Sequence, residues 1–312
     1  MHHYTAFGLS IHSEISLPEL AEGDPHFTAD VYIRQGAINL PAMRPTTIYR
    51  RGIQAFFGQD EHALYLDWAG VASFRATAGS ELLVSPATSD GNIISLFTVS
   101  EALGLLLFQR GHFLLHASSV AVGDEAWCFM GVPGAGKSTT AAAFIKAGCR
   151  LLSDDLTAIT FNEPGNPVII PAYPQLKIWE NTVTGLHYNK SELEPVSEGV
   201  NKFSYQPREQ FSARAVPLKK VFFLHKARNK PAIQPMNVAE VPGEMLRNFP
   251  LATELMTGDN LKRHFFQSLQ CARSAELFRK RRPEGFDNLE KWVATSVREQ
   301  LIAEQDVVKD SV

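Results

Sequence analysis

A glycine-rich segment, Gly131–Ser138, constrains the fold of this chain more than any other feature. It reads Gly-Val-Pro-Gly-Ala-Gly-Lys-Ser and matches the pattern G-x-x-x-x-G-K-[ST]. The apolar run Ala126–Met130 precedes it with the composition of a buried strand, and residues 137–147 follow with that of a helix ended by Gly148. With a further strand at Leu151–Ser153, this order predicts one βαβ-like unit in an α/β fold.

The same segment predicts a binding site for the phosphates of a nucleotide. Backbone N–H groups of such a loop converge on a phosphate chain, and the following helix N-terminus adds partial positive charge. Lys137 would supply a full charge to the β and γ oxygens, and Ser138 a hydroxyl to Mg²⁺, which prefers oxygen ligands. The predicted cofactors are therefore ATP and Mg²⁺. The predicted nucleotide-binding residues are Gly131, Val132, Pro133, Gly134, Ala135, Gly136, Lys137, Ser138 and Thr139.

Two consecutive acids, Asp154 and Asp155, follow Ser138 by 16 and 17 residues. This spacing suits one helix, one turn and one strand, and it predicts that both acids return to the carboxyl edge of the sheet beside the phosphates. One carboxylate there can hold Mg²⁺ while the other accepts a proton from an attacking hydroxyl. The alternative is a helix cap or a salt bridge at the end of the strand.

Companion residues disfavour two other classes of nucleotide hydrolase. Guanine specificity usually needs an N-K-x-D element, and the near match at residues 229–232, Asn-Lys-Pro-Ala, lacks the Asp. A motor or transporter ATPase would normally carry its acid much farther downstream than Asp154. The class that fits best is a kinase.

His116 lies 22 residues before Ser138, where we predict the strand that precedes the strand of the glycine-rich loop. If those two strands are neighbours, the imidazole can reach the acids or the γ-phosphate. The alternative is a core histidine with satisfied hydrogen bonds.

The chain has 312 residues, enough for one large domain or two modest ones. Residues 1–92 contain short alternating runs separated by Gly, Pro and Asp, and predict a β-rich N-terminal domain. The apolar segment Ile93–Phe108 is interrupted by Glu101 and is shorter than the roughly 20 residues of a bilayer span, so it predicts a buried helix. Residues 93–312 are predicted to form the P-loop catalytic domain, with helical patterns from about 243 to 302.

Composition limits the partners. The chain has 30 Lys and Arg against 33 Asp and Glu, a formal charge of −3, so no global basic field draws it to nucleic acid or to a membrane. The three cysteines lack metal-type spacing and predict reduced thiols. The first residues lack the pattern of a signal peptide, which favours a cytoplasmic location. Any bound anion must be held by local charge, and residues 201–230 and Lys262–Arg282 are the most basic stretches.

The stretch from Leu115-His116-Ala117 through the glycine-rich loop to Asp155 resembles the bacterial HPr kinase/phosphorylase family. That family has a His at the same distance before the loop Ser, a helix ending in x-G-x-R-L, and a double Asp at the same distance after it. The resemblance implies a phosphoenolpyruvate-carboxykinase-like P-loop kinase core that phosphorylates a seryl side chain. By position, Asp155 would be the base, Asp154 the metal-side or orienting partner, and His116 a supporting residue. The order of roles within the acid pair stays open.

The sequence departs from that family after the acids. The glycine-rich signature E-x-R-G-x-G is replaced by residues 172–179, Ala-Tyr-Pro-Gln-Leu-Lys-Ile-Trp, so we expect a forward kinase without phosphorylase activity. This segment, together with Tyr4–Ile11 and Leu17–Leu20, is similar to the HPr-kinase-like tailoring kinases of lasso peptide clusters. Some of those kinases phosphorylate the C-terminal Ser of a precursor peptide.

Three polar residues are candidates for contact with the acceptor: Gln175, Lys177 and Lys202. The expected function is that of a Mg-ATP-dependent serine kinase acting on a peptide or small protein, with the C-terminal Ser of a lasso precursor as the specific expectation. Two alternatives stay open: a small-molecule kinase of the same fold, and a nucleotide-binding regulator without transfer activity. A homo-oligomer is compatible with the sequence.

Overall fold

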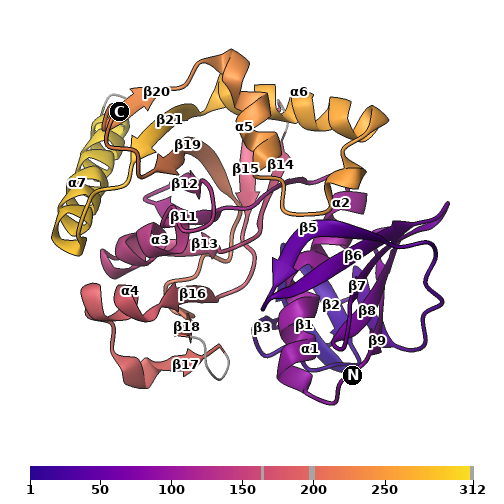
Figure 1. Cartoon of the computed structure of the whole chain (residues 1–312). Coiled ribbons are helices and arrows are strands. Elements are labelled where there is room, and N and C mark those ends of the chain that lie inside the picture. The colour runs from indigo at the N-terminus through magenta and orange to yellow at the C-terminus, as the bar shows by residue number, and fades with distance from the viewer. Residues whose placement is uncertain (163–164, 197–200, 310–312) are drawn as a thin grey trace. The chain divides into compact units, whose positions relative to one another are not determined.

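The computed structural model describes residues 1–162, 165–196 and 201–309, which fall into two compact units (Figure 1). Unit 1 comprises Met1–Leu115 and Phe249–Gln267, and unit 2 comprises His116–Asn248 and the described chain from Ser268 onward. The sequence predicts a domain boundary after residue 92. The compact units divide after Leu115, because the helical segment after residue 90 packs on strands of unit 1.

Unit 1 is built on a nine-stranded sheet with the order β3-β1-β2-β4-β9-β8-β7-β6-β5. The strands are β1 His2–Ala6, β2 Leu9–Ser13, β3 Ala21–Glu22, β4 Val31–Gln35, β5 Arg44–Arg50, β6 Ile53–Gln59, β7 Ala63–Trp68, β8 Ala72–Thr77 and β9 Glu81–Pro86. Two hairpins turn through Phe7-Gly8 and Arg51-Gly52, where φ is positive at both residues (53° and 69°, 53° and 78°), as type I′ turns require. The β-rich character expected for this part of the chain is therefore present.

One apolar helical segment follows the sheet of unit 1. It consists of α1 Gly91–Phe97, the π-helical turn η1 Thr98–Ala102 and α2 Leu103–Gln109, and Asp90 caps its N-terminus. Its length and composition would suffice for a membrane span, but 78% of its apolar window is buried inside the structure. It packs on β8 and β9, as expected of a core helix, and β10 Phe113–Leu115 follows it. The π-helical turn was not predicted; Ser100 there has non-helical angles (φ −95°, ψ −115°).

Unit 2 contains a mixed sheet in which β14, β15, β19, β12, β11 and β13 are neighbours in that order, with β21 and then β20 beyond β19. The strands are β11 Ser118–Val122, β12 Glu125–Met130, β13 Arg150–Ser153, β14 Thr157–Phe161, β15 Pro167–Ile170, β19 Val216–His225, β20 Ile233–Pro235 and β21 Glu276–Arg281. The strands β12, β19 and β21 are parallel. A smaller sheet has the order β16-β18-β17, formed by β16 Leu176–Trp179, β17 Leu193–Pro195 and β18 Lys202–Tyr205.

The helical region expected from about 243 to 302 is interrupted by a strand. The described helices after the smaller sheet's first strand are α4 Glu180–Gly185, η2 Lys190–Glu192, η3 Val238–Glu240, α5 Val241–Arg247, η4 Thr253–Leu255, α6 Gly258–Ser274 and α7 Phe286–Lys309. β21 lies between α6 and α7 and pairs over its own full length with Lys220–His225 of the parallel strand β19, where Phe278 stacks on Phe222 (ring centroids 5.5 Å apart). Pairing with a central strand therefore outweighs the local helical pattern of Glu276–Arg281.

Aromatic side chains form the core of unit 2 around the helix that follows the glycine-rich loop, α3 Lys137–Lys146. Phe144 of α3 stacks on Phe129 of β12 (5.2 Å), which also stacks on Phe222 of β19 (5.7 Å). Trp292 of α7 meets Phe144 edge to face. These contacts fix α3 against the sheet and so fix the loop at its N-terminus.

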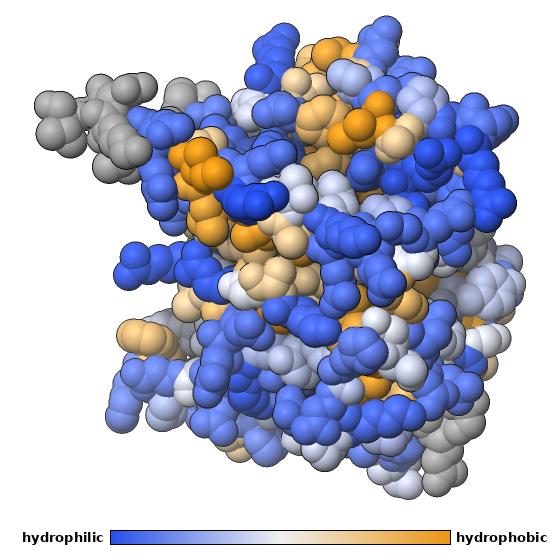
Figure 2. Space-filling model, turned by 90° about the vertical axis from the view of Figure 1, so that its left-hand side faces the viewer, coloured by the Kyte–Doolittle hydropathy of each residue, from blue (hydrophilic) through white to orange (hydrophobic). Residues whose placement is uncertain are grey.

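The surface is largely polar where it can be seen. On the face of the molecule in Figure 2, hydrophilic residues predominate and hydrophobic residues occur in separate groups. Exposed large apolar side chains within the described ranges include Val132 of the glycine-rich loop and Trp179 at the end of β16. Both belong to the part of unit 2 that carries the candidate site.

Candidate functional site

The glycine-rich loop connects β12 to α3, as the sequence predicts. Gly131, Gly134 and Gly136 have φ values of 142°, 78° and 100°, which side-chain-bearing residues rarely adopt. A Cβ on Gly131 would lie 2.6 Å from the carbonyl oxygen of Leu224 on β19. Glycine is therefore required there both for the angle and for the close approach of β19.

Lys137, the first residue of α3, lies folded back over this loop. Its side chain is buried, and its Nζ donates a hydrogen bond to the carbonyl of Gly131 at 3.0 Å. Burial lowers the pKa of Lys137, and the charges of Asp155 and Asp154 oppose that shift. An anionic phosphate chain in the loop would offer this ammonium a better partner than a neutral carbonyl.

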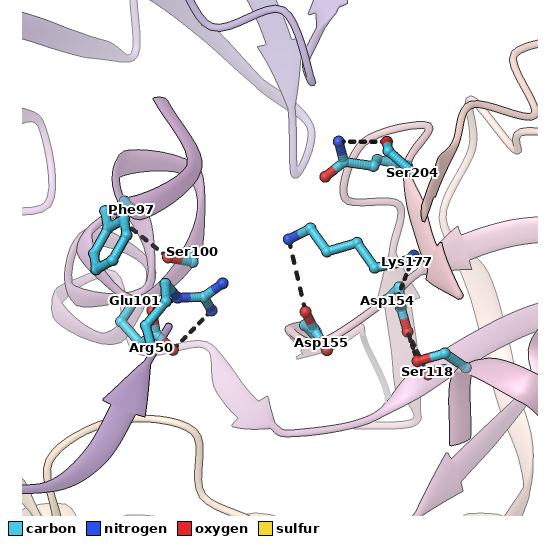
Figure 3. A network of polar contacts seen from close by, with 11 residues as sticks. Arg50, Phe97, Ser100, Glu101, Ser118, Asp154, Asp155, Lys177 and Ser204 are labelled. Carbon is cyan, nitrogen blue, oxygen red and sulfur yellow. Dashed lines mark hydrogen bonds and ion pairs between the residues drawn. The ribbon is translucent and has the colours of Figure 1, made fainter. Parts of the chain in front are cut away.

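Asp154 is a buried carboxylate that accepts hydrogen bonds from residues of β11, α3 and β16. Its Oδ1 accepts hydrogen bonds from the hydroxyls of Ser118 (2.6 Å) and Ser138 (2.9 Å), and its Oδ2 accepts one from the backbone N–H of Lys177 (3.0 Å; Figure 3). Burial raises the pKa of Asp154, the neighbouring charge of Asp155 raises it further, and the hydrogen bonds act in the opposite direction. Burial and the adjacent negative charge therefore disfavour the ionised form of Asp154, and its hydrogen bonds favour that form.

Sheet order explains why these groups meet. β11 lies between β12 and β13 and is antiparallel to both, so its first residue is at the same edge as their last residues. Ser118 at the start of β11 is in register with Phe129 near the end of β12, and Ser119 with Ser153 at the end of β13. Asp154 follows Ser153 directly and reaches the loop at that edge.

Asp155 adopts a left-handed conformation (φ 64°), which is uncommon for a residue with a side chain. Its carboxylate points toward Lys177, and the distance from Oδ2 to Nζ is 3.7 Å (Figure 3). The Lys177 side chain is 6% exposed, whereas that of Asp155 is 27% exposed. Asp155 is thus the more accessible of the two acids, and a buried ammonium lies beside it.

The three residues predicted to contact the acceptor lie on or next to the smaller sheet. Gln175 is buried, and its amide donates to the hydroxyl of Ser204 at 3.0 Å. Lys202 of β18 lies over the ring of Trp179, 5.7 Å from its centroid. Lys177 is directed at Asp155 and is buried, so its amine lies at the acid pair and not on an open peptide-binding surface.

His116 is not in a strand, contrary to the sequence prediction. The chain bends after the three-residue strand β10, and β11, which pairs with β12, begins only at Ser118. The backbone N–H of His116 donates to the carbonyl of Asn248 at 2.6 Å, and the Asn248 side-chain oxygen accepts from the N–H of Gly131 at 3.2 Å. Asn248 therefore connects the His116 backbone to the start of the loop.

Thr139, predicted to bind nucleotide, turns its hydroxyl toward helix α4, where it pairs with the hydroxyl of Thr182 at 2.9 Å. Sequence reasoning missed Ser118 and Asn248, since each reaches the site through strand order or a distant loop. The only local signal was the position of Ser118 two residues after His116.

The donor set at this edge suits a magnesium ion. Ser138 Oγ and Asp154 Oδ1 lie 2.9 Å apart, and both are oxygen ligands of the kind Mg²⁺ prefers. Within residues 1–162, 165–196 and 201–309, no cluster of three or more His, Cys, Asp or Glu side chains offers a complete metal site.

No protein-family model matches this chain, and no curated protein matches it. Among solved structures it is similar to the HPr(Ser) kinase/phosphatase from Coxiella burnetii, at 12% sequence identity and a TM-score of 0.35. The match covers 62% of this chain and 98% of that one. A similarity this low carries no argument about function, so the functional conclusion rests on the geometry of the site.

Proposed function

We propose that this protein is a Mg-ATP-dependent phosphotransferase whose acceptor is a hydroxyl group. One observation carries the proposal: the hydroxyl of Ser138, in the G-x-x-x-x-G-K-S loop, is hydrogen-bonded to Asp154, and Asp155 follows it. In this proposal the loop binds phosphates, Ser138 and Asp154 hold the metal ion and Asp155 is the accessible acid, all at one sheet edge. These are the groups that phosphoryl transfer needs, because its catalysis is mostly positioning and charge neutralisation.

Each group has a distinct role in this proposal. The loop amides and Lys137 hold the phosphates, and Ser138 and Asp154 are the residues that would hold Mg²⁺. When bound, Mg²⁺ neutralises charge on the β and γ oxygens. Asp155 accepts the proton of the acceptor hydroxyl as its oxygen bonds to the γ-phosphorus and the bond from phosphorus to the leaving ADP oxygen breaks. Lys177, at 3.7 Å, orients the Asp155 carboxylate and balances its charge.

The finer proposal concerns the acceptor, which we take to be a seryl hydroxyl at the C-terminal end of a peptide such as a lasso precursor. Support comes from the accessible Asp155 and from Lys202 and Trp179 on the smaller sheet, which offer a cation and an aromatic face. A flexible tail can bring its hydroxyl within about 2.6–3.2 Å of the base without deforming a folded partner. Of the two candidate lysines, Lys202 is the one proposed for the terminal carboxylate, because Lys177 is buried beside Asp155.

Nucleotide binding is the first test. Lys137→Ala should abolish most MgATP binding, measured by titration calorimetry, while its unfolding temperature stays near that of the wild type. Lys219→Ala is the matched control, because Lys219 is an exposed lysine in β19 of the same unit. Equal affinity in Lys137→Ala and wild type would contradict the proposed phosphate site.

Transfer and acceptor class are tested together by mass spectrometry. The protein is incubated with MgATP and a precursor peptide that ends in Ser, then with the same peptide amidated or ending in Ala. The proposal expects a phosphoryl mass gain on the free Ser-ended peptide, none on the Ala-ended peptide and less on the amidated peptide. It also expects no loss of that phosphate on addition of inorganic phosphate. Gain on all three peptides would refute the tail-directed acceptor, and gain on a metabolite panel alone would favour a small-molecule kinase.

A further inference from the structure

Four consecutive cations lie at the end of β21, the first three within the strand and each with a partner that explains it. Arg279 pairs with Glu244 at 2.9 Å and with Glu240 at 3.3 Å. Lys280 lies over the ring of Trp292, 4.9 Å from its centroid. Arg281 donates to the carbonyl of Arg228 at 3.0 Å. The fourth cation, Arg282, lies one residue past the end of the strand and has a different environment.

The Arg282 side chain lies against the glycine-rich loop at Gly136. A Cβ built on Gly136 would stand 2.4 Å from Cδ, 3.0 Å from Nε and 3.5 Å from Cζ of Arg282. Gly136 directly precedes Lys137 and forms the N-cap of α3 with φ 100°. Glycine is therefore needed at position 136 for two reasons: the positive φ of the turn and the close approach of the Arg282 side chain.

Charge makes this position notable. Within the ranges the structure describes, no carboxylate pairs with the Arg282 guanidinium, and its pKa is lowered by burial with no opposing contribution from an acid. Partial burial of a charge without a counter-charge is unfavourable unless a ligand supplies one. The β19 carbonyl of His225 fixes the Arg282 backbone by accepting from its N–H at 2.9 Å, so the side chain is held over the loop by the sheet.

We propose that Arg282 binds the terminal phosphates of the nucleotide held by Gly131–Ser138. The inference rests on the proposed nucleotide site and adds to it a second cation, contributed by a strand more than a hundred residues from the loop. A guanidinium offers a planar set of N–H donors that fits two phosphate oxygens at once, which the Lys137 ammonium cannot do. A partly buried guanidinium without a carboxylate partner is expected where the phosphates of a bound nucleotide supply the negative charge.

The test compares Arg282→Met with Arg281→Met. Methionine keeps an aliphatic stem on Gly136, and Arg281 is the neighbouring guanidinium with a backbone partner outside the loop. Losing hydrogen bonds to a charged group should weaken MgATP and MgADP binding by about 10- to 100-fold in Arg282→Met. Adenosine and AMP binding should change by less than about twofold, as should all four ligands in Arg281→Met.

Chemical modification of the wild type gives a second measurement that needs no variant to fold. MgATP should protect Arg282 from phenylglyoxal, detected by peptide mass mapping, whereas adenosine should not. Three outcomes overturn the inference. Unchanged MgATP affinity in Arg282→Met, with Lys137→Ala impaired, refutes it and leaves the nucleotide site intact. An equal loss for adenosine assigns Arg282 to the nucleoside instead. Absence of MgATP binding by the wild type overturns this inference and the proposed function together.

Discussion

Glu101 in unit 1 and Asp154 in unit 2 are both largely buried carboxylates, yet their surroundings shift ionisation in opposite directions (Figure 3). Burial works to raise the pKa of Glu101, but the charge and hydrogen bonds of Arg50 outweigh it and hold that pKa below its ordinary value. Arg50 donates two hydrogen bonds of 2.9 Å, one to each Glu101 oxygen. At Asp154, burial and repulsion from Asp155 prevail, and the pKa is raised.

We interpret this as the difference between a charge that stabilises the fold and a charge at the proposed phosphotransfer site. The Arg50–Glu101 pair is bidentate and its charges balance within unit 1. In unit 2, Asp154 accepts its hydrogen bonds from two hydroxyls and a backbone N–H, and the contact of the adjacent Asp155 with Lys177 is longer, at 3.7 Å. Perturbed, incompletely balanced groups are typical of sites that await a ligand or ion. We therefore expect substitutions in the two places to affect different measurements.

The largest expected effect is that of Asp155→Asn on catalysis. Asparagine keeps the size of the side chain but cannot take a proton, so turnover should fall by about 10²- to 10⁴-fold, the usual loss for a general base. MgATP affinity should change far less. Asp154→Asn should instead raise the Mg²⁺ concentration needed for half-maximal activity. If Asp155→Asn kept full turnover and Asp154→Asn abolished it, the two roles would be exchanged.

Next in size is the effect of Glu101→Gln on stability. The substitution leaves the Arg50 charge largely buried without its counter-charge, and breaking such a pair costs about 3–5 kcal/mol. Urea unfolding would measure the loss. Glu81→Gln is the control, because its pairs with Arg34 and Arg75 are longer (3.7 and 3.4 Å) and more exposed, and pairs of that kind contribute about 0–1 kcal/mol. Equal losses in both variants would show that Arg50 and Glu101 are not the structural pair described here.

Local features of the chain were predictable from sequence and long-range ones were not. The strand, loop and helix around Gly131–Ser138 follow from residues adjacent in sequence, and the return of the chain to the same edge at Asp154 follows from one helix and one strand. Ser118 reaches Asp154 only because β11 is inserted between β12 and β13, an order that no local pattern specifies. The position of Arg282 beside the loop likewise depends on the pairing of β21 with β19, and the local sequence of β21 has a helical pattern that does not predict this pairing.

A smaller effect is expected from Ser118→Ala compared with Ser119→Ala. These neighbours on β11 are both buried, but Ser118 donates to the Asp154 carboxylate and Ser119 shares a hydrogen bond with the neutral hydroxyl of Ser153. Loss of the bond to a charged group should cost about 1.5–3 kcal/mol, and loss of the neutral bond about 0.5–1.5 kcal/mol. Urea unfolding of both variants near pH 8 checks the order. The reverse order would mean that Asp154 is not ionised in the folded protein.

The smallest effect is a pair of opposite pH slopes in folding stability. The folded-state pKa of Glu101 lies below its unfolded value, so its ionised form adds stability above the unfolded pKa, and this is lost as pH falls through the folded pKa. The destabilisation in Glu101→Gln should therefore shrink toward acid pH. The folded-state pKa of Asp154 lies above its unfolded value, so ionisation opposes folding at neutral pH, and the penalty disappears as pH falls through the raised pKa to the ordinary value of 3.8.

Asp154→Asn should accordingly be most favourable, relative to wild type, at neutral pH and should lose that advantage in acid. The amide facing the Lys177 N–H costs a hydrogen bond, but that cost is the same at every pH and leaves the slope intact. Each unit of pKa shift corresponds to about 1.4 kcal/mol across the titration, so urea unfolding from about pH 8 to about pH 2 follows both curves, with the Glu101 change confined to the acid end. Parallel slopes for the two variants would mean that the two carboxylates are balanced in the same way, and would remove the distinction between a structural and a functional acid.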